Sequence, residues 1–220
     1  AITVPGALSG WQELLDRYGT ISLAEGLEPA MRYVDSGFVV TPVIAGDWAS
    51  QANVLRRDPG AVATFLPDSQ PPEAGDWFTN PDYARTLREI AREGPSLMYG
   101  GALGQRIVDR VHELGGFLTL EDLRRHENTW VTPISTTFKG YRVWELPPNN
   151  QGIAALEMLR ILEPYDLASL GHNSAKYLHL LIESKKLAYA DLTRYVGDPG
   201  HLSLTPAQML SDPFIAERRR

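Results

Sequence analysis

The sequence predicts an α+β fold that is mainly helical, with at least one β-hairpin. Two features support this prediction. Most segments repeat apolar residues at the spacing of one helix face, whereas residues 132–146 are rich in β-branched and aromatic residues around a tight turn. The chain has 220 residues, 43% of them hydrophobic and 22% charged, and can bury the core that such a fold needs.

Two amphipathic helices are predicted at the start of the chain. Apolar residues at helical spacing predict the first over residues 7–18, and Gly19 is expected to end it in the left-handed conformation. Ser22–Glu25 has the spacing of a capping box, and the apolar stripe behind it continues to Gly37. Pro29 interrupts this stripe, so the second helix is expected to be kinked there or to begin close to it.

The following stretch has a weaker pattern. Scattered Pro and Gly in residues 39–80 predict one short helix near 45–57, followed by loop. Asn80–Pro81 is typical of an N-cap with a first-turn proline. The apolar stripe after it predicts a helix that ends at Gly94.

Two further helices are predicted before the strands. Ser96 is expected to cap the first, which ends at Gly115–Gly116, and Thr119–Asp122 opens a second, short one. Gly100–Gly104 resembles a glycine-rich phosphate loop only superficially, because the segment before it has the pattern of a helix and not of a strand. These glycines are therefore expected to allow close helix packing.

The second half of the chain begins with the predicted hairpin, whose turn is Lys139–Gly140. A strongly apolar helix over residues 151–163 follows, which should be buried and is stopped by Pro164. The last clear helix spans about 174–196 and ends at Gly197. One side of it is lined by Leu178, Leu181, Ile182, Tyr189, Leu192 and Val196, of which the last three are expected to face a core.

Composition argues against several classes of function. The net charge of −6 and the lack of a basic stripe argue against a nucleic-acid partner. The one basic run, Arg218–Arg220, is expected to be a solvated helix face. No apolar run approaches the ~20 residues of a membrane span. With no Cys, disulfides and thiolate nucleophiles are excluded, and every compartment remains open.

Few residues offer chemistry of their own. The five His are dispersed, without the paired spacing of a zinc protease, so no metal site is expected. Ser135–Thr137 lies in a predicted strand, where ordinary strand residues are a better interpretation than a hydroxyl nucleophile that would need a base beside it.

One polar turn leads into a predicted helix: Asn149, Asn150, Gln151 and Gly152. Free backbone N–H groups at the start of a helix can hold an anion or a substrate carboxylate, so this turn is the candidate substrate-binding site. The alternative is that these residues simply cap the helix after a strand, which is a common role of Asn.

Several short motifs follow one another in a fixed order along nearly the whole chain. They include Val4–Trp11, Arg17–Gly19, Ala84–Ala91, Tyr99–Gly101, Thr119–Leu123, Phe138–Tyr141, Pro147–Gly152 and Leu187–Pro199. Each motif alone is weak. As an ordered set they resemble the gamma-glutamyltransferase (gamma-glutamyltranspeptidase) family of N-terminal-nucleophile hydrolases.

The resemblance implies that the chain is the middle and later part of a large subunit with the αββα fold of that superfamily. Residues 1–220 are then one partial domain, expected to be incomplete at both ends. In this family a precursor cuts itself before a Thr, which becomes the nucleophile of the small subunit and uses its own α-amino group as base. The Thr attacks the γ-glutamyl amide of glutathione or a related compound, and the acyl group passes to water, an amino acid or a peptide.

The implied partners are a γ-glutamyl small molecule and the small subunit of the same precursor, and no cofactor is implied. No position in this chain matches the family's nucleophilic Thr or the Arg that grips the substrate carboxylate. No catalytic residue is therefore assigned, and the chain alone is expected to be inactive. A periplasmic or extracellular location is compatible with the resemblance.

Two departures from the family pattern bear on the substrate. Where many relatives carry Pro-Pro-Ser-Ser-Gly-Gly, this chain has Pro148–Gly152, which suggests an acylase-like or otherwise altered preference. Where they commonly have Ala-Asp-Arg, it has Ala190–Leu192, which removes a guanidinium that could have paired with a buried carboxylate. Two alternatives stay open: a cephalosporin- or glutaryl-acylase-type amidohydrolase of the same fold, and a non-catalytic helical scaffold or interaction domain.

Overall fold

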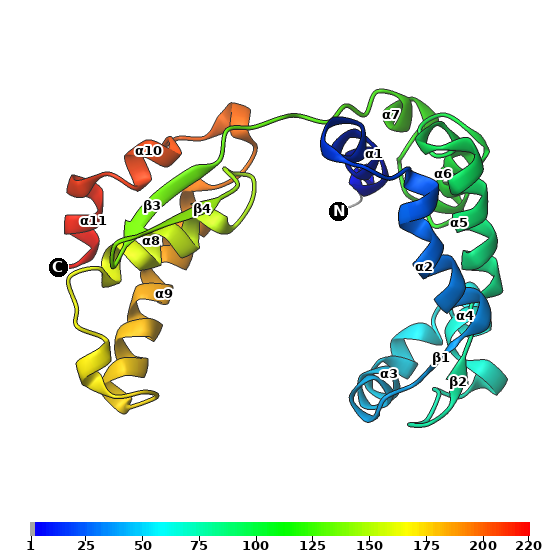
Figure 1. The fold of residues 1–220 in the computed structure, drawn as a ribbon, viewed down its shortest axis with the longest axis horizontal. Helices are drawn as coiled ribbons and strands as arrows, with labels where there is room; N and C mark the ends of the chain where they lie inside the picture. The colour runs from blue at the N-terminus through cyan, green and yellow to red at the C-terminus, as the bar shows by residue number, and fades with distance from the viewer. Residues whose placement is uncertain (1–2) are drawn as a thin grey trace. The chain divides into compact units, whose positions relative to one another are not determined.

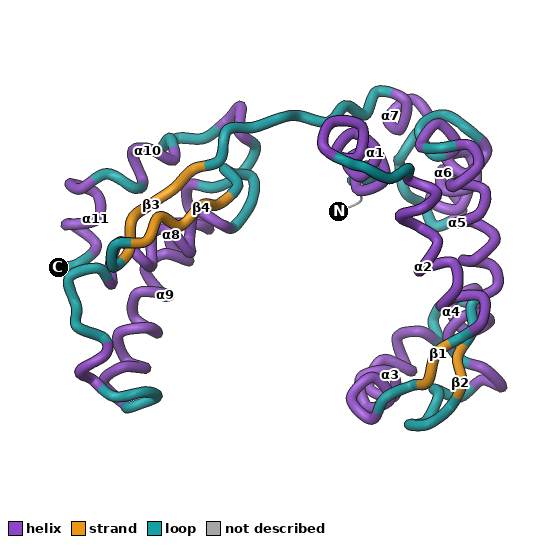
Figure 2. Tube along the Cα trace, viewed as in Figure 1, coloured by secondary structure: helices purple, strands orange, loops and turns teal. Residues whose placement is uncertain are grey.

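The computed structural model describes residues 3–220, which form two compact units. Unit 1 ends at Asn128 and unit 2 begins at Thr129. The start of the expected domain, at Ala1, lies outside the described residues. Unit 1 is mainly helical (Figure 1), and unit 2 places a β-hairpin beside its helices (Figure 2).

Unit 1 is organised around two helices whose apolar faces meet. Its elements within the described residues are α1 (Ala7–Tyr18), α2 (Leu23–Ser36), β1 (Phe38–Val39), α3 (Pro42–Leu55), α4 (Pro59–Phe65), the 3₁₀ turn η1 (Pro67–Ser69), β2 (Trp77–Phe78), α5 (Pro81–Glu93), the 3₁₀ turn η2 (Pro95–Leu97), α6 (Ala102–Glu113) and α7 (Leu120–Arg124). Leu23 and Leu27 of α2 pack with Leu87 and Ile90 of α5, and Leu8 of α1 joins the same cluster. Burial of these side chains is the main stabilising term of the unit.

The start of unit 1 follows the sequence prediction closely. Helix α1 has the predicted bounds, and the capping box is present: the Ser22 hydroxyl accepts the Glu25 N–H, and the Glu25 carboxylate accepts the Ser22 N–H at 2.7 Å. The prediction for Gly19 is wrong, since its backbone is extended with φ −75°. Glycine fits there for a different reason, because a Cβ would come within 2.6 Å of the Leu15 carbonyl oxygen.

Residues 38–78 are more regular than predicted. Helix α3 begins earlier than expected, and α4 was not expected at all. Its N-cap Asp58 accepts a hydrogen bond from Ala61 N–H at 2.8 Å and is followed by Pro59, a start signal hidden among the other prolines of the stretch. Strand β1 pairs antiparallel with β2 in the register Phe38 to Phe78.

The glycines near α6 allow close packing, as predicted. A Cβ on Gly104 would clash with the backbone carbonyl of Met98 and would press on Leu123 of α7. The predicted cap of this helix is wrong, because Ser96 donates to the Glu93 carbonyl and α6 begins only at Ala102. Ser96 lies inside the 3₁₀ turn η2, and Gly100 and Gly101 come before the helix, which the apolar spacing alone did not indicate.

Unit 2 surrounds one buried helix, α8. The elements of this unit are β3 (Ile134–Phe138), β4 (Tyr141–Glu145), α8 (Gly152–Leu162), the 3₁₀ turn η3 (Ala168–Leu170), α9 (Ala175–Tyr195), the 3₁₀ turn η4 (Pro199–His201), α10 (Pro206–Met209) and α11 (Asp212–Arg218). Helix α8 contacts the hairpin, α9 and α11. Its predicted burial is confirmed, since Ile153, Leu156 and Leu162 are at most 2% exposed.

The hairpin was predicted correctly, including its turn. Lys139 and Gly140 both have positive φ, 49° and 85°, as a two-residue hairpin turn of this twist requires. The strands are in register from Ile134 opposite Glu145 to Phe138 opposite Tyr141. Within the part of the chain that the structure describes, β3 and β4 pair only with each other, so each leaves one edge unpaired.

The predicted core face of α9 is wrong in part, because Leu192 and Val196 are half-buried but Tyr189 is exposed. Tyr189 is 43% exposed, whereas the side chains buried from this helix belong to Ser184, Ala188 and Asp191. These three are spaced as one helix face. The longer apolar residues looked like the buried stripe, but the helix packs closely on α8 through small and polar residues instead.

Candidate functional site

The polar turn predicted as a substrate site joins β4 to α8. Asn149 and Asn150 are exposed, Gln151 is the N-cap and Gly152 is the first residue of the helix. No side chain caps α8; the Asn150 side-chain oxygen instead accepts the Gln151 N–H at 2.8 Å. The capping role that the sequence offered as an alternative is therefore confined to the residue before the helix.

Gly152 is fixed by a close approach. A Cβ there would clash with the side chain of Glu145, the last residue of β4. Only glycine lets the start of α8 sit against the end of the strand. The turn is thus held rigidly on two elements that belong to the core of unit 2.

The turn borders a groove of about 690 Å³ in unit 2. The lining residues are Thr129, Val131, Leu146, Pro147, Pro148, Asn149, Asn150, Asp198, Pro199, Leu202 and Pro206. The groove brings Asn149 and Asn150 together with the Asp198–Pro199 motif, although the two are far apart in sequence. Gln151 and Gly152, the other two predicted site residues, do not line it.

The chemistry available in this groove is binding rather than bond cleavage. Its walls are mostly proline and aliphatic, and its polar atoms near the turn are neutral amides. Asp198 is occupied as a cap, accepting the Gly200 N–H at 2.8 Å. Amides can hydrogen bond a carboxylate or an amide substrate, but no hydroxyl of the lining set is paired with a base, as a nucleophile requires.

A second polar group of unit 2 is buried and was not predicted. Glu157 of α8 is 0% exposed and Asp191 of α9 is 4% exposed. Arg218 of α11 donates to both carboxylate oxygens of Asp191, from Nε at 2.6 Å and from Nη2 at 2.9 Å. The two oxygens of Glu157 make no hydrogen bond.

Burial first, and then the neighbouring Asp191 carboxylate, raise the pKa of Glu157 to about 8, while the more weakly acting Arg218 lowers it. Two ionised carboxylates offer only acceptors to each other. A proton on Glu157 supplies the missing donor and brings the cluster of three to zero net charge. Glu157 therefore keeps its proton to a higher pH than an ordinary glutamate does.

The basic run that supplies this cluster is only partly solvated, since Arg219 and Arg220 are exposed but Arg218 is not. Arg218–Arg220 was expected to be a solvated face, but the Arg218 side chain is only 18% exposed. Arg219 donates to the carbonyls of Arg160 and Ile161 at the end of α8. Arg218 also supplies the guanidinium whose loss after Asp191 was noted from the sequence.

Unit 1 contains a serine and a histidine in contact. Ser9 Oγ lies 2.9 Å from His126 Nε2, and also 2.9 Å from Asn128 Oδ1 and from the Gly6 carbonyl oxygen. The Asn128 amide nitrogen donates to Glu13, which fixes its oxygen toward Ser9. Ser9 has one proton for the Gly6 and Asn128 oxygens, and the tautomer of His126 that donates from Nε2 to Ser9 Oγ completes this network. A donating His is no base, and the contact is structural.

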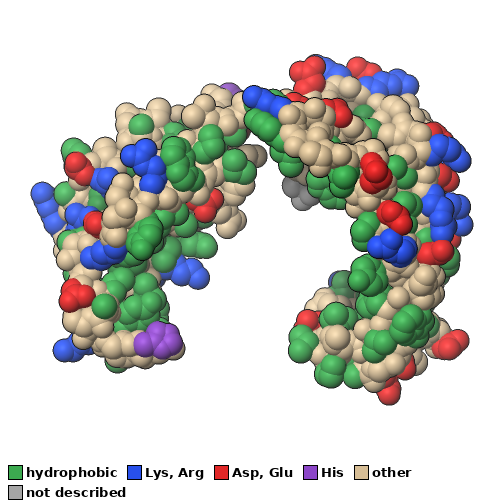
Figure 3. All heavy atoms as spheres, in the orientation of Figure 1, with side chains coloured by type: hydrophobic (Ala, Val, Ile, Leu, Met, Phe, Trp, Pro, Cys, Tyr) green, Lys and Arg blue, Asp and Glu red, His purple; other side chains and the backbone are tan. Residues whose placement is uncertain are grey.

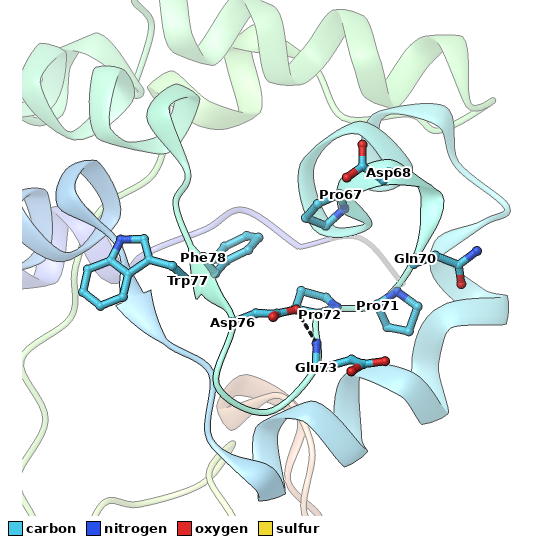
Figure 4. A pocket seen from close by; sticks show the side chains of 9 residues that line it. All are labelled: Pro67, Asp68, Gln70, Pro71, Pro72, Glu73, Asp76, Trp77 and Phe78. Atoms are coloured by element: carbon cyan, nitrogen blue, oxygen red, sulfur yellow. Dashed lines mark hydrogen bonds between the residues drawn. The ribbon is translucent and has the colours of Figure 1, made fainter.

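A further hollow of unit 1, about 470 Å³, lies between η1 and β2 (Figure 4). Its lining includes the carboxylates of Asp68, Glu73 and Asp76. Asp76 accepts the Glu73 N–H at 2.8 Å and thereby closes the loop. The rest of the lining consists of proline, amide and aromatic side chains: Pro67, Gln70, Pro71, Pro72, Trp77 and Phe78.

The described part of the chain holds neither a metal-binding cluster nor a membrane-spanning helix. Among residues 3–220, no three His, Asp or Glu side chains gather closely enough to hold a metal ion. None of the helices in that range combines the length and the apolar character that crossing a membrane requires.

Known proteins resemble this chain over its whole length. The acylase ACY 1 proenzyme of Pseudomonas sp. (strain SE83) is 40% identical over 220 residues, and the glutathione hydrolase-like YwrD proenzyme of Bacillus subtilis (strain 168) is 35% identical over 218. These matches cover 100% and 99% of this chain but only 39% and 41% of the relatives. The chain therefore spans about two fifths of their length.

A solved structure gives the same result for the fold. The cephalosporin acylase from Bacillus halodurans superposes with a TM-score of 0.91 at 38% identity, over 99% of this chain and 41% of that one. The predicted α+β class is confirmed by this match. The family model of gamma-glutamyltranspeptidase matches residues 1–220, and the chain belongs to the gamma-glutamyltranspeptidase family.

Proposed function

We propose that the protein is a γ-glutamyl amide hydrolase or transferase, of which this chain is part of the large subunit. The observation that carries the proposal is the family match over residues 1–220, together with a glutathione hydrolase-like relative. The reaction would use an N-terminal Thr outside these residues. Its hydroxyl attacks the γ-glutamyl carbonyl while its α-amino group takes the hydroxyl proton. The amide C–N bond then breaks, the proton passes to the leaving amine, and water or an amino acid takes the acyl group from the Thr oxygen.

The partner of this chain is then the small subunit of the same precursor, and the hairpin is the surface that fits it. Both strands have an unpaired edge within the described residues, and Tyr141 and Trp144 of β4 are 77% and 55% exposed. Hydrophobic side chains also gather on the visible surface over the hairpin and α9 (Figure 3). Additional strands would satisfy the edges and cover these residues.

Within this chain, the turn Asn149–Gly152 is the part we propose to contact substrate. The support is its exposed amides beside a groove and a helix start that no side chain caps. In an active full-length enzyme, the double variant Asn149→Ala/Asn150→Ala should raise KM several-fold with a smaller effect on kcat. Gln51→Ala, an exposed amide of unit 1, is the control. An unchanged KM would remove the turn from the site.

An acylase activity is the second candidate. It is favoured by the 40% identity to an acylase proenzyme and by Asn149–Gln151, which stand where many γ-glutamyl enzymes have Ser-Ser-Gly. Both reactions cleave an amide through the same kind of acyl-enzyme, so the scaffold alone does not separate them. The difference lies in the α-amino group, which the γ-glutamyl substrate carries and the glutaryl substrate lacks, whereas both have a carboxylate at the far end of the same carbon chain.

The test uses the full-length precursor and two anilides, one γ-glutamyl and one glutaryl. The first proposal expects self-cleavage and faster release from the γ-glutamyl anilide, and glycylglycine as acceptor separates transfer from hydrolysis. Faster release from the glutaryl anilide would support the acylase instead. A precursor that neither cleaves itself nor turns over either anilide would instead support the non-catalytic helical scaffold or interaction domain. The 220-residue chain is expected to show no turnover.

A further inference from the structure

The short helix α11 is fastened to the rest of unit 2 mainly through charged groups. Arg218 forms its bidentate pair with Asp191 of α9, and the Arg218 guanidinium also stacks over Phe214, 4.3 Å from the ring centre. Asp212 at the start of α11 pairs with Arg160 of α8. Ile215 adds an apolar contact and is 1% exposed.

The Arg218–Asp191 pair is the strongest of these contacts. Both partners are largely buried, with side chains 18% and 6% exposed, whereas the Asp212 side chain is 94% exposed. A buried bidentate pair contributes much more than a solvated one, provided that no further charge is left unbalanced beside it. Whether such an unbalanced charge is present depends on the protonation of Glu157.

Within residues 3–220, the charged groups that act on Glu157 are Asp191 from α9 and Arg218 from α11. On the hairpin side, Glu145 lies against Gly152 in the first turn of α8. When Glu157 is ionised, two buried carboxylates share one guanidinium. When it is protonated, Asp191 and Arg218 form a balanced pair and Glu157 can donate to Asp191.

We propose that Glu157, Asp191 and Arg218 form a proton-dependent latch, which holds α11 against α8 and α9 while Glu157 carries its proton and weakens when that proton is lost. Two effects of ionisation oppose each other. An ionised Glu157 attracts Arg218 and so favours the closed helix, but it also gains by letting water reach it, which favours opening. Glu157 is 0% exposed and its oxygens make no hydrogen bond, while Arg218 gives its hydrogen bonds to Asp191, so an ionised Glu157 gains more from water than it loses with Arg218 and opening is favoured.

The test is hydrogen exchange of the α11 amides in the intact protein, followed by mass spectrometry between roughly pH 6 and pH 9 and corrected for the intrinsic rate. In this pH range, opening of α11 is coupled to the loss of the proton from Glu157. Protection of α11 should therefore fall with pH, by at most about tenfold per unit, and level off above about pH 8. Amides of α5 in unit 1 provide the internal reference.

Three variants make the outcome specific. Glu157→Gln should keep α11 protected across the range, and Glu183→Gln, an exposed carboxylate of the same helix as Asp191, should behave as wild type. Arg218→Met should lose α11 protection at every pH. If this variant also unfolds α8, the comparison of wild type with Glu157→Gln still tests whether α11 protection depends on the Glu157 proton. Protection that stays flat or rises with pH in the wild type, or a slope retained by Glu157→Gln, would overturn the latch.

Discussion

At the scale of single residues, burial changes the acidity of Glu157 in unit 2. Glu157 lies on a strongly apolar helix, yet packing places its carboxyl beside Asp191 with 0% exposure. The same carboxyl on a helix surface would be ionised at neutral pH. Here the fold makes it an acid that keeps its proton, and the stability of the chain should depend on pH accordingly.

The direction of this pH dependence follows from the pKa of Glu157 in the folded and in the unfolded chain. The folded pKa of about 8 is above the ordinary value of 4.5, so the folded chain binds more protons than the unfolded chain between these values. The stability that the chain has while Glu157 is protonated is therefore lost as the pH rises from 4.5 to about 8. Glu157→Gln should be roughly 1 to 3 kcal/mol more stable than wild type at pH 9 and similar to it at pH 4.

Urea unfolding at both pH values measures this difference. Glu183→Gln is the matched control, because the Lys186 ammonium beside Glu183 lowers its pKa. Removing that carboxylate should slightly destabilise the chain above the ordinary carboxyl range, the opposite sign from Glu157→Gln. Equal effects of Glu157→Gln at pH 4 and pH 9 would show that folding does not raise the pKa of Glu157.

At the scale of elements, two helical glycines show different effects: close packing decides at one position and helix propensity at the other. Gly104 in α6 and Gly46 in α3 both lie inside helices, where glycine is disfavoured relative to alanine. A Cβ on Gly104 would meet the Met98 carbonyl, whereas a Cβ on Gly46 would meet nothing within 4 Å. The same substitution should therefore have opposite effects at the two positions.

Gly104→Ala should destabilise the chain by about 1 to 3 kcal/mol, because the Met98 backbone has to move. Gly46→Ala should stabilise it by about 0.5 to 1 kcal/mol through helix propensity. Thermal or urea unfolding of the two variants beside wild type checks both signs. A stabilising Gly104→Ala would contradict the close packing of α6 on η2 and α7.

The elements also show what local sequence can predict. Capping boxes, first-turn prolines and the Lys139–Gly140 turn depend on neighbouring residues, so α1, α2, α5 and the hairpin were predicted well. The buried face of α9 depends on which helix packs against it, and small residues there let α8 come close. The polar turn was found as a motif, but Glu157, Asp191 and Arg218 meet only through tertiary packing.

At the scale of the whole molecule, unit 2 shows an incomplete sheet. A two-stranded hairpin with free edges is marginal unless other elements cover it. Helix α8 covers one face, while Tyr141 and Trp144 stay exposed on β4. In the isolated chain such edges and aromatic side chains favour association with other copies.

The purified 220-residue chain should therefore associate in a concentration-dependent way, measurable by sedimentation velocity. Trp144→Ser should lower the association constant several-fold, because it removes the larger apolar contact while leaving the strand backbone intact. Tyr83→Ser, which truncates an aromatic of α5 with 48% exposure, should not. If the proposed small subunit covers the hairpin, the full-length protein will be indifferent to Trp144→Ser in this measurement. A monomeric isolated chain, or an equal effect of Tyr83→Ser, would show that the hairpin is not the adhesive surface.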